Sequence, residues 1–205
     1  MVENLVERIR QKDQRAMSQL YQMFIRELSS VCYRYVPSES DAKDVLQESF
    51  VKIFTSMPTF DYRGEAALRM WMRKVVVNEA LHFLKERSML KTKLGVRVVD
   101  VDLERAADAL PSDNEPSEAE TLTPEELHQM IRELPDGCRT VVNLYVFEGY
   151  SHKQIAELLN VTVSTSASQL YYAKQLLAKR IKQIKEETDN EWQMGRTASK
   201  ETGKL

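Results

Sequence analysis

The sequence predicts an all-α protein, in which two helical domains are joined by an acidic linker. Three observations predict this fold class. Apolar residues recur at helical spacing along most of the chain. Gly and Pro number only 6 each among 205 residues, which is too few for a turn-rich β protein. Residues 98–122 lack this periodicity and are rich in Asp and Glu, so they are expected to be a flexible linker between a domain at residues 1–97 and another at residues 123–185.

Four helices are expected in the N-terminal domain. Apolar residues at helical spacing over residues 2–36 predict two of them, and Asp13 is a suitable N-cap for the second. A third helix is expected over residues 41–56, because Pro58 cannot continue it. The fourth, over residues 66–87, is apolar around most of its circumference, which is typical of a helix buried in a bundle. The pattern therefore indicates a helical bundle.

The C-terminal domain begins with a strong helix signal. Thr123 and Glu126 have the spacing of a capping box, with Pro at the first helical position. A second helix is expected over residues 137–147, and Gly149 breaks it. At the end of the chain, residues 186–205 are polar and aperiodic, and they are predicted to form a disordered tail.

A helix-turn-helix is predicted between these segments. Ser151 and Gln154 form a second capping box, Asn160 suits the left-handed residue that ends the helix, and Thr162 can cap the next one. Polar side chains on the exposed face of that next helix suit hydrogen bonds to base edges, and a lysine further along suits a phosphate. These candidate DNA-contacting residues are Ser164, Thr165, Ser168, Gln169, Tyr172 and Lys174. The alternative is a helical hairpin whose polar face is solvated.

The charge of the chain is segregated, although its net value is only -2. Residues 63–97 hold nine basic and three acidic side chains, and residues 151–185 hold six basic side chains and one acidic one. Between them, residues 100–120 hold eight acidic side chains and one Arg. Two basic blocks separated by an acidic one are typical of a protein that contacts a polyanion at two points.

Aromatic and basic residues are combined in the N-terminal domain. Spacings of three or four residues place cations, an amide and an indole on one face of the long helix, and the loop before it adds two aromatics and an arginine. These residues are Phe60, Tyr62, Arg63, Trp71, Lys74, Asn78, His82 and Lys85. Such a combination suits single-stranded DNA, because bases stack on aromatic rings while cations neutralise phosphates. The alternative for Phe60 and Trp71 is that both are core residues.

Asp41, Asp44 and Glu48 form an acidic face on the third helix. Three interpretations are open: a solvated helix start favoured by the helix dipole, a surface for a basic protein partner, and the metal site of an enzyme. The metal interpretation lacks a neighbouring His and a Gly-rich phosphate loop, and Cys32 and Cys138 are too far apart for zinc spacing. The sequence therefore predicts no metal, no cofactor and no catalytic residue.

Three stretches, in order along the chain, resemble one protein family. They are Asp41–Phe50; Phe60–Glu65 followed by Trp71–Leu81; and Leu134-Pro135 followed by Glu148–Leu159. On these residues the chain resembles the extracytoplasmic-function (group IV) sigma factors of the sigma-70 family. One departure lies in the recognition helix, where the family usually has Gly near Ser164 and a basic residue near Ala167. This departure affects how the minus-thirty-five element would be read.

The resemblance implies a bacterial initiation factor that directs promoter-specific transcription, in an extracytoplasmic stress or signalling response, and is not an enzyme. Residues 1–97 would bind polymerase and recognise and melt the minus-ten element, and residues 123–185 would read the minus-thirty-five element. The polymerase-docking residues would be Asp41, Asp44, Gln47 and Glu48. The implied partners are core RNA polymerase, through its clamp and flap, promoter DNA in double- and single-stranded form, and an anti-sigma factor.

Two other function classes fit the sequence less well. A stand-alone helix-turn-helix regulator would have no need of the aromatic and basic cluster, and a metal-dependent nuclease would need metal ligands that the sequence lacks. The charged N-terminus predicts no signal peptide. The apolar run nearest to a membrane span is interrupted by charged residues such as Arg73 and Glu79. We therefore expect a soluble, cytoplasmic protein without a membrane span.

Overall fold

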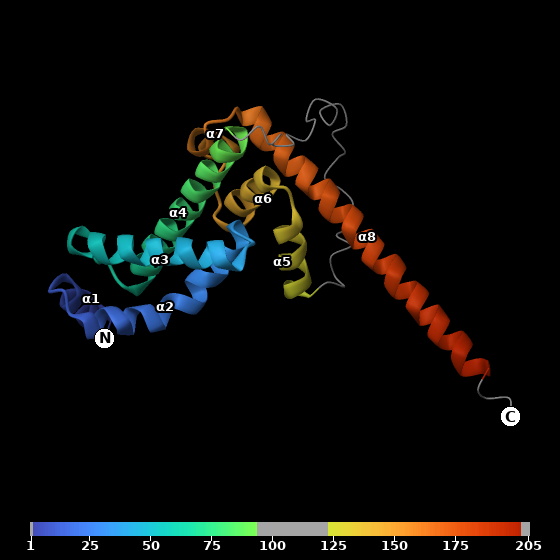
Figure 1. Ribbon diagram of the computed structural model, residues 1–205, viewed down its shortest axis with the longest axis horizontal. Helices are drawn as coiled ribbons and strands as arrows, with labels where there is room; N and C mark the ends of the chain where they lie inside the picture. Colours follow the sequence, from blue (N-terminus) through green and yellow to red (C-terminus); the bar gives the residue numbers. More distant parts are fainter. Residues whose placement is uncertain (1, 94–122, 202–205) are drawn as a thin grey trace. The chain divides into compact units, whose positions relative to one another are not determined.

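The computed structural model describes residues 2–93 and 123–201, and no strand occurs within these two ranges. The all-α prediction is thus confirmed. The described residues form two compact units, one before and one after the acidic segment in the sequence (Figure 1). That segment, which was expected to be a flexible linker, lies outside the described residues.

The first unit is a bundle in which α4 crosses α2 and α3 (Figure 1). Its elements are α1 (Val2–Arg10), α2 (Gln14–Tyr35), α3 (Glu39–Ser56), the short 3₁₀ turn η1 (Met57–Thr59) and α4 (Glu65–Lys93). Leu68, Met72 and Val76 recur at every fourth position of α4 and are fully buried. Each such side chain stabilises the unit by roughly 1.5–3 kcal/mol. This stripe holds the long helix in place, which fixes the direction of its exposed face.

Helix caps in the first unit follow from the sequence. Asp13 is the N-cap of α2, as predicted, and its carboxylate accepts hydrogen bonds from the backbone N–H of Arg15 at 2.8 Å and of Ala16 at 3.2 Å. The hydrogen bond from the Arg8 side chain, together with these backbone donors, lowers the pKa of Asp13. The third helix begins two residues earlier than expected, because Ser38 caps it.

Cys32 joins two helices of this bundle. Its thiol is completely buried and donates a hydrogen bond to the carbonyl of Ala42 at 3.6 Å, which ties α2 to the first turn of α3. Burial raises the pKa of the Cys32 thiol to about 12, because a thiolate cannot be solvated there. Burial also raises the pKa of Cys138 in the second unit. Both thiols are free, and both act as small apolar core groups.

The second unit contains the predicted helix-turn-helix. Its elements are α5 (Pro124–Glu133), α6 (Asp136–Val142), the π-helical turn η4 (Asn143–Phe147), α7 (His152–Leu159) and α8 (Val163–Glu201). Both predicted capping boxes are present, at Thr123 with Glu126 and at Ser151 with Gln154. Asn160 ends α7 in the left-handed conformation, with φ 54°. Ile155, Leu170 and Ala173 bring α7 and α8 into one core with α6.

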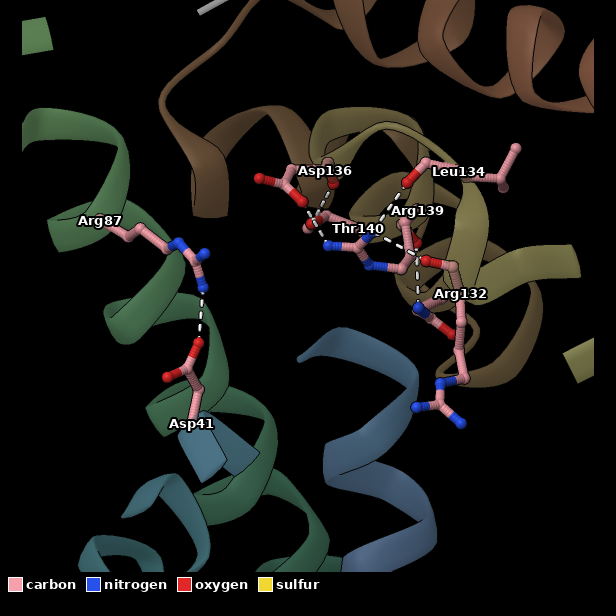
Figure 2. A network of polar contacts seen from close by, with 8 residues as sticks. Asp41, Arg87, Arg132, Leu134, Asp136, Arg139 and Thr140 are labelled. Atoms are coloured by element: carbon pink, nitrogen blue, oxygen red, sulfur yellow. Dashed lines mark hydrogen bonds and ion pairs between the residues drawn. The ribbon is translucent and has the colours of Figure 1, made fainter. Parts of the chain in front are cut away.

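Arg139 ties the start of this unit together from inside. The residue is only 3% exposed, and its side chain donates to the carbonyl oxygens of Leu134 at 2.7 Å and Arg132 at 3.2 Å (Figure 2). It also pairs with the carboxylate of Asp136. Carbonyls at the end of a helix have no partner within that helix, so the buried guanidinium supplies one for the end of α5.

Two features of this unit differ from the sequence-based expectations. The helix expected over residues 137–147 changes to π-helical hydrogen bonding at Asn143, where Glu148 N–H donates to the Asn143 carbonyl at 3.1 Å. The helix α8 runs to Glu201, so it extends into the segment from residue 186 that was expected to be a disordered tail. Missing apolar periodicity shows that a segment does not pack, but a helix that has already begun can extend without packing through residues that favour helices.

Candidate nucleic-acid interface

The long helix α4 presents the predicted basic face to solvent. Lys74, Asn78, His82 and Lys85 are all exposed and lie on one side of the helix, opposite its buried stripe. The imidazole Nδ1 of His82 lies 3.7 Å from the carboxylate of Glu86. The side chains of Lys74, Asn78 and Lys85 are exposed and carry hydrogen-bond donors. This face can therefore approach a phosphate backbone or unpaired bases.

The aromatic residues beside this face contact one another. Phe60 and Trp71 stack, with ring centroids 4.4 Å apart and planes inclined by 24°. Both are half-buried, so neither lies in the core nor extends freely from the surface. The guanidinium of Arg10 donates to the Phe60 carbonyl at 2.7 Å, which fixes the loop to α1. A ring pair held open to solvent in this way offers a flat surface on which a base can stack.

Part of the remaining loop lines a hollow that the sequence did not reveal. Arg63 pairs with Asp61 at 2.8 Å and is largely exposed, whereas Tyr62 is half-buried. Asp61 and Tyr62 line a polar hollow of about 480 Å³ together with α1 residues that include Glu7 and Arg10. The amphipathic pattern of α1 predicts which of its sides is buried but not which loop its polar side meets, so its part in the site had no sequence signal.

The acidic face of α3 divides into one paired and three exposed residues. Asp41 forms an ion pair with Arg87 of α4 at 2.6 Å (Figure 2), so its carboxylate already has a partner within the unit. Asp44, Gln47 and Glu48 are exposed as predicted. Val51, one turn after Gln47 and Glu48, is 51% exposed. The surface is therefore acidic with an apolar side chain inside it, a composition suited to binding another protein.

The helix-turn-helix is fixed by side chains on both of its helices. The hydroxyl of Thr162 accepts from the Thr165 N–H at 2.9 Å and so caps α8. Across the motif, His152 Nδ1 and the buried Ser166 hydroxyl share a hydrogen bond of 2.9 Å. Tyr145 stacks on the His152 ring at 4.7 Å between centroids. The orientation of α8 relative to α7 is thus determined by polar contacts as well as by the core.

The candidate residues of α8 do not all face solvent equally. Ser164 and Lys174 are exposed, while Thr165, Ser168 and Tyr172 are half-buried. Gln169 is half-buried as well, and its carboxamide nitrogen lies 2.6 Å from the point where Gly137 of α6 would carry a β-carbon. Gln169 therefore has the same partial exposure as Thr165, Ser168 and Tyr172, and its carboxamide also lies against α6. Its side chain lies at the flank of α8, where it fills the space left by the missing side chain of Gly137.

Comparison with known families accounts for both units. Residues 20–89 match the model of Sigma-70 region 2, and residues 124–177 match that of Sigma-70, region 4. These ranges contain α3 and most of α4 in the first unit, and α7 with the first part of α8 in the second. The chain belongs to the sigma-70 family. It is a sigma factor, a component of promoter-directed transcription initiation by RNA polymerase, as the sequence predicted, and sigma factors are not enzymes.

Sequence similarity to known proteins extends along most of this sigma factor. It is 28% identical over 184 residues to the ECF RNA polymerase sigma-E factor of Salmonella typhimurium, which covers 88% of this chain and 94% of that protein. It is equally identical to the RNA polymerase sigma-H factor of Pseudomonas aeruginosa, over 89% and 94% of the two chains. A solved structure of the sigma factor RpoE with the anti-sigma factor NepR from Bartonella quintana has a TM-score of 0.46, 15% identity, and coverage of 80% and 96%.

Parts of the sigma factor lie outside both family matches. The helix α1, which contributes to the hollow beside Tyr62, precedes the region 2 match, and α8 extends beyond the region 4 match by 24 residues, from 178 to 201. No helix within the described ranges is long and apolar enough to span a membrane.

Proposed function

We propose that this sigma factor binds core RNA polymerase through α3, melts and reads the minus-ten element with α4 and the preceding loop, and reads the minus-thirty-five element with α8. The observation that carries this proposal is the exposed cationic and amide face of α4 beside a stacked aromatic pair. A protein that binds only duplex DNA needs no such surface, because bases in a duplex are already stacked.

Strand opening follows from the chemistry of this surface. Lys74 and Lys85 stand on α4 with Asn78 and His82 between them, so phosphates of one strand can be neutralised along the helix while its bases turn toward the loop. Extracting a base from a duplex costs a few kcal/mol, and stacking on an aromatic ring offsets that cost. The Phe60–Trp71 pair offers such a surface, and Tyr62 with Arg63 extends it along the loop. These residues would act on an unpaired strand once polymerase has positioned it.

In the second unit, the exposed start of α8 would enter the major groove, with Ser164, Thr165, Ser168 and Tyr172 near the bases. Lys174, one turn further on, would contact a phosphate. Gln169 belonged to this set in the sequence-based prediction, and its contact with α6 now supports a role in positioning α8.

Polymerase docking would use Asp44, Gln47 and Glu48 around Val51. We expect the double replacement Asp44→Ala/Glu48→Ala to weaken core polymerase binding about tenfold, because interface charges that face a basic partner lose their attraction. Fluorescence anisotropy of the labelled sigma factor, titrated with core polymerase, measures this affinity. Asp41 was also predicted to dock, and its pairing with Arg87 supports a role within the unit instead.

A matched control for this docking prediction lies on the same helix. Glu39 is equally acidic, pairs with Lys43 at 2.7 Å and lies on another side of α3. Glu39→Ala should therefore leave the affinity for core polymerase within about twofold of wild type. Wild-type affinity of the double variant, with an intact circular dichroism spectrum in both, would contradict docking through this face.

The sigma-E likeness supports a role in an extracytoplasmic stress or signalling response, and we propose that an anti-sigma factor holds this protein inactive between signals. Localisation to the cytoplasm is part of the same proposal, since core polymerase and promoter DNA would be found there. Copurification of the tagged sigma factor from unstressed and stressed cells tests this point, because an anti-sigma factor should be recovered in the first sample and depleted in the second.

Run-off transcription tests the function as a whole. Core polymerase with the full-length sigma factor should initiate from a subset of a random promoter library, and core polymerase alone should not. The competing function is a stand-alone helix-turn-helix regulator, which the helix-turn-helix geometry of α7 and α8 also permits. A gel shift separates the two, since a stand-alone regulator would bind promoter duplex tightly and specifically without core polymerase.

A further inference from the structure

Apolar side chains are exposed at the start of the recognition helix. Val163, the first residue of α8, is 51% exposed, and Ala167, one turn later on the same side, is exposed as well. Leu158, near the end of α7, is 43% exposed. The first residues of the second helix in a helix-turn-helix are those that reach base edges in the major groove. An apolar strip therefore stands where bases would be read.

Polar groups in the same part of α8 are already engaged. The hydroxyls of Thr162 and Thr165 share a hydrogen bond of 2.8 Å, and the buried Ser166 is bound to His152. The carboxamide of Gln169, which in an exposed position would suit adenine, lies against Gly137. Ser164 and Ser168 are the polar side chains left beside the apolar strip.

Charge is also absent from the sequence of this segment. Residues 163–173 include no Asp, Glu, Lys or Arg, and the first charged residue of α8 is Lys174. The segment therefore cannot make a bidentate arginine contact to guanine or a carboxylate contact to the cytosine amine. Exposed cations follow further along, at Lys174, Lys179 and Arg180, where they suit phosphates and carry no base preference.

We propose that α8 recognises thymine methyl groups, and that Val163 and Ala167 make those contacts in the upstream promoter duplex. The thymine C5-methyl is the one apolar group that base pairs present in the major groove, so it is the feature that an apolar strip can distinguish. The proposal rests on the proposed function, in which α8 binds the minus-thirty-five element. It specifies the chemistry of that element, which is rich in thymines facing the start of α8.

Uracil substitution tests this proposal directly, because uracil pairs as thymine does and lacks only the methyl group. Holoenzyme made with the full-length chain is bound to a promoter selected from a random library, and thymines are replaced by uracil in the upstream element alone. We expect affinity to fall about fourfold for each methyl group that the helix covers. The DNA control carries uracil only in the flanking duplex that lies further upstream than the minus-thirty-five element, and this replacement should have no effect on affinity.

Matched valine variants identify the residue responsible. Val163→Ala should weaken binding to the thymine promoter and remove most of the difference between thymine and uracil. Val146 is 60% exposed on η4 and lies outside α8, so Val146→Ala should retain the full difference. Both positions are exposed, and neither replacement should alter thermal unfolding.

Each other outcome has a distinct meaning. Wild-type holoenzyme that binds its promoter equally well with uracil would overturn the methyl proposal and leave the proposed function standing. An equal loss on thymine and uracil DNA in Val163→Ala would show that this valine meets the DNA backbone or a protein, which also overturns the proposal. Failure of the holoenzyme to bind any promoter in the library would reject the proposed function, and the methyl proposal with it.

Discussion

Replacing Arg139 by alanine is expected to lower the free energy of unfolding of the second unit by about 3 kcal/mol or more. The guanidinium is buried and donates to the carbonyls of Leu134 and Arg132 while it pairs with Asp136. A hydrogen bond from a charged donor contributes roughly 1.5–3 kcal/mol, and a buried carbonyl left without a donor costs a similar amount. Such a loss is a large part of the stability of a small domain.

Hydrogen exchange read by mass spectrometry measures this effect, because peptides from α5 to α7 report on the second unit and peptides from α2 to α4 on the first. Arg180→Ala is the matched control, since Arg180 is exposed on α8 and its loss should change stability by less than about 0.5 kcal/mol. The stability of Arg139→Lys should lie between those of Arg139→Ala and wild type, because lysine keeps the charge but lacks the branched guanidinium that reaches two carbonyls. Equal protection in Arg139→Ala and Arg180→Ala would contradict the role assigned to the buried guanidinium.

Promoter melting is expected to depend on Tyr62 and Asn78. Stacking of a base on an aromatic side chain contributes about 1–3 kcal/mol, so Tyr62→Ala should slow open-complex formation on duplex promoter roughly 5- to 150-fold. Asn78→Ala should act in the same direction through lost hydrogen bonds from the exposed face of α4. On a template that is already melted over the minus-ten element, both defects should be much smaller, because the cost of opening has been removed. Permanganate footprinting of unpaired thymines follows the reaction.

A conservative replacement controls for the position of Tyr62. Tyr62→Phe keeps the ring and removes the hydroxyl, so it should open promoters at close to the wild-type rate if stacking is what matters. Equal defects on duplex and pre-melted templates in Tyr62→Ala would indicate base reading in place of melting. No defect on either template would show that Tyr62 serves only the hollow that it shares with α1.

Local signals in the sequence were sufficient for much of this structure. The caps at Asp13, Thr123 and Ser151 and the left-handed Asn160 are determined by residues within one turn, so their chemistry can be read without knowing the fold. The exposed face of α4 could also be predicted from the sequence. A helix rotates by a constant angle per residue, so its apolar stripe defines the exposed side opposite to it.

Contacts between residues far apart in the sequence could not be predicted in this way. The pairing of Asp41 with Arg87 joins residues 46 apart, and many carboxylate and guanidinium pairs would look equally suitable in the sequence. The position of Gln169 depends on the absence of a side chain at Gly137, which is a property of another helix. The π-helical turn at Asn143 changes the hydrogen-bond register without changing the apolar pattern strongly enough to be seen. In each case, the residue pattern within one or two helical turns is not enough to predict the structure.

Burial of Cys32 affects how readily this protein reacts with oxidants. Peroxide and disulfide reagents react with the thiolate, and burial raises the pKa of the Cys32 thiol to about 12, which favours the unreactive thiol form at pH 7. The thiol is also held between α2 and α3, so a reagent would have to separate two packed helices to reach it. The Cys138 thiol is buried as well, with a raised pKa. Neither sulfur is therefore suited to sensing oxidative stress. The folded protein should keep both thiols reduced under conditions in which exposed cysteines are oxidised.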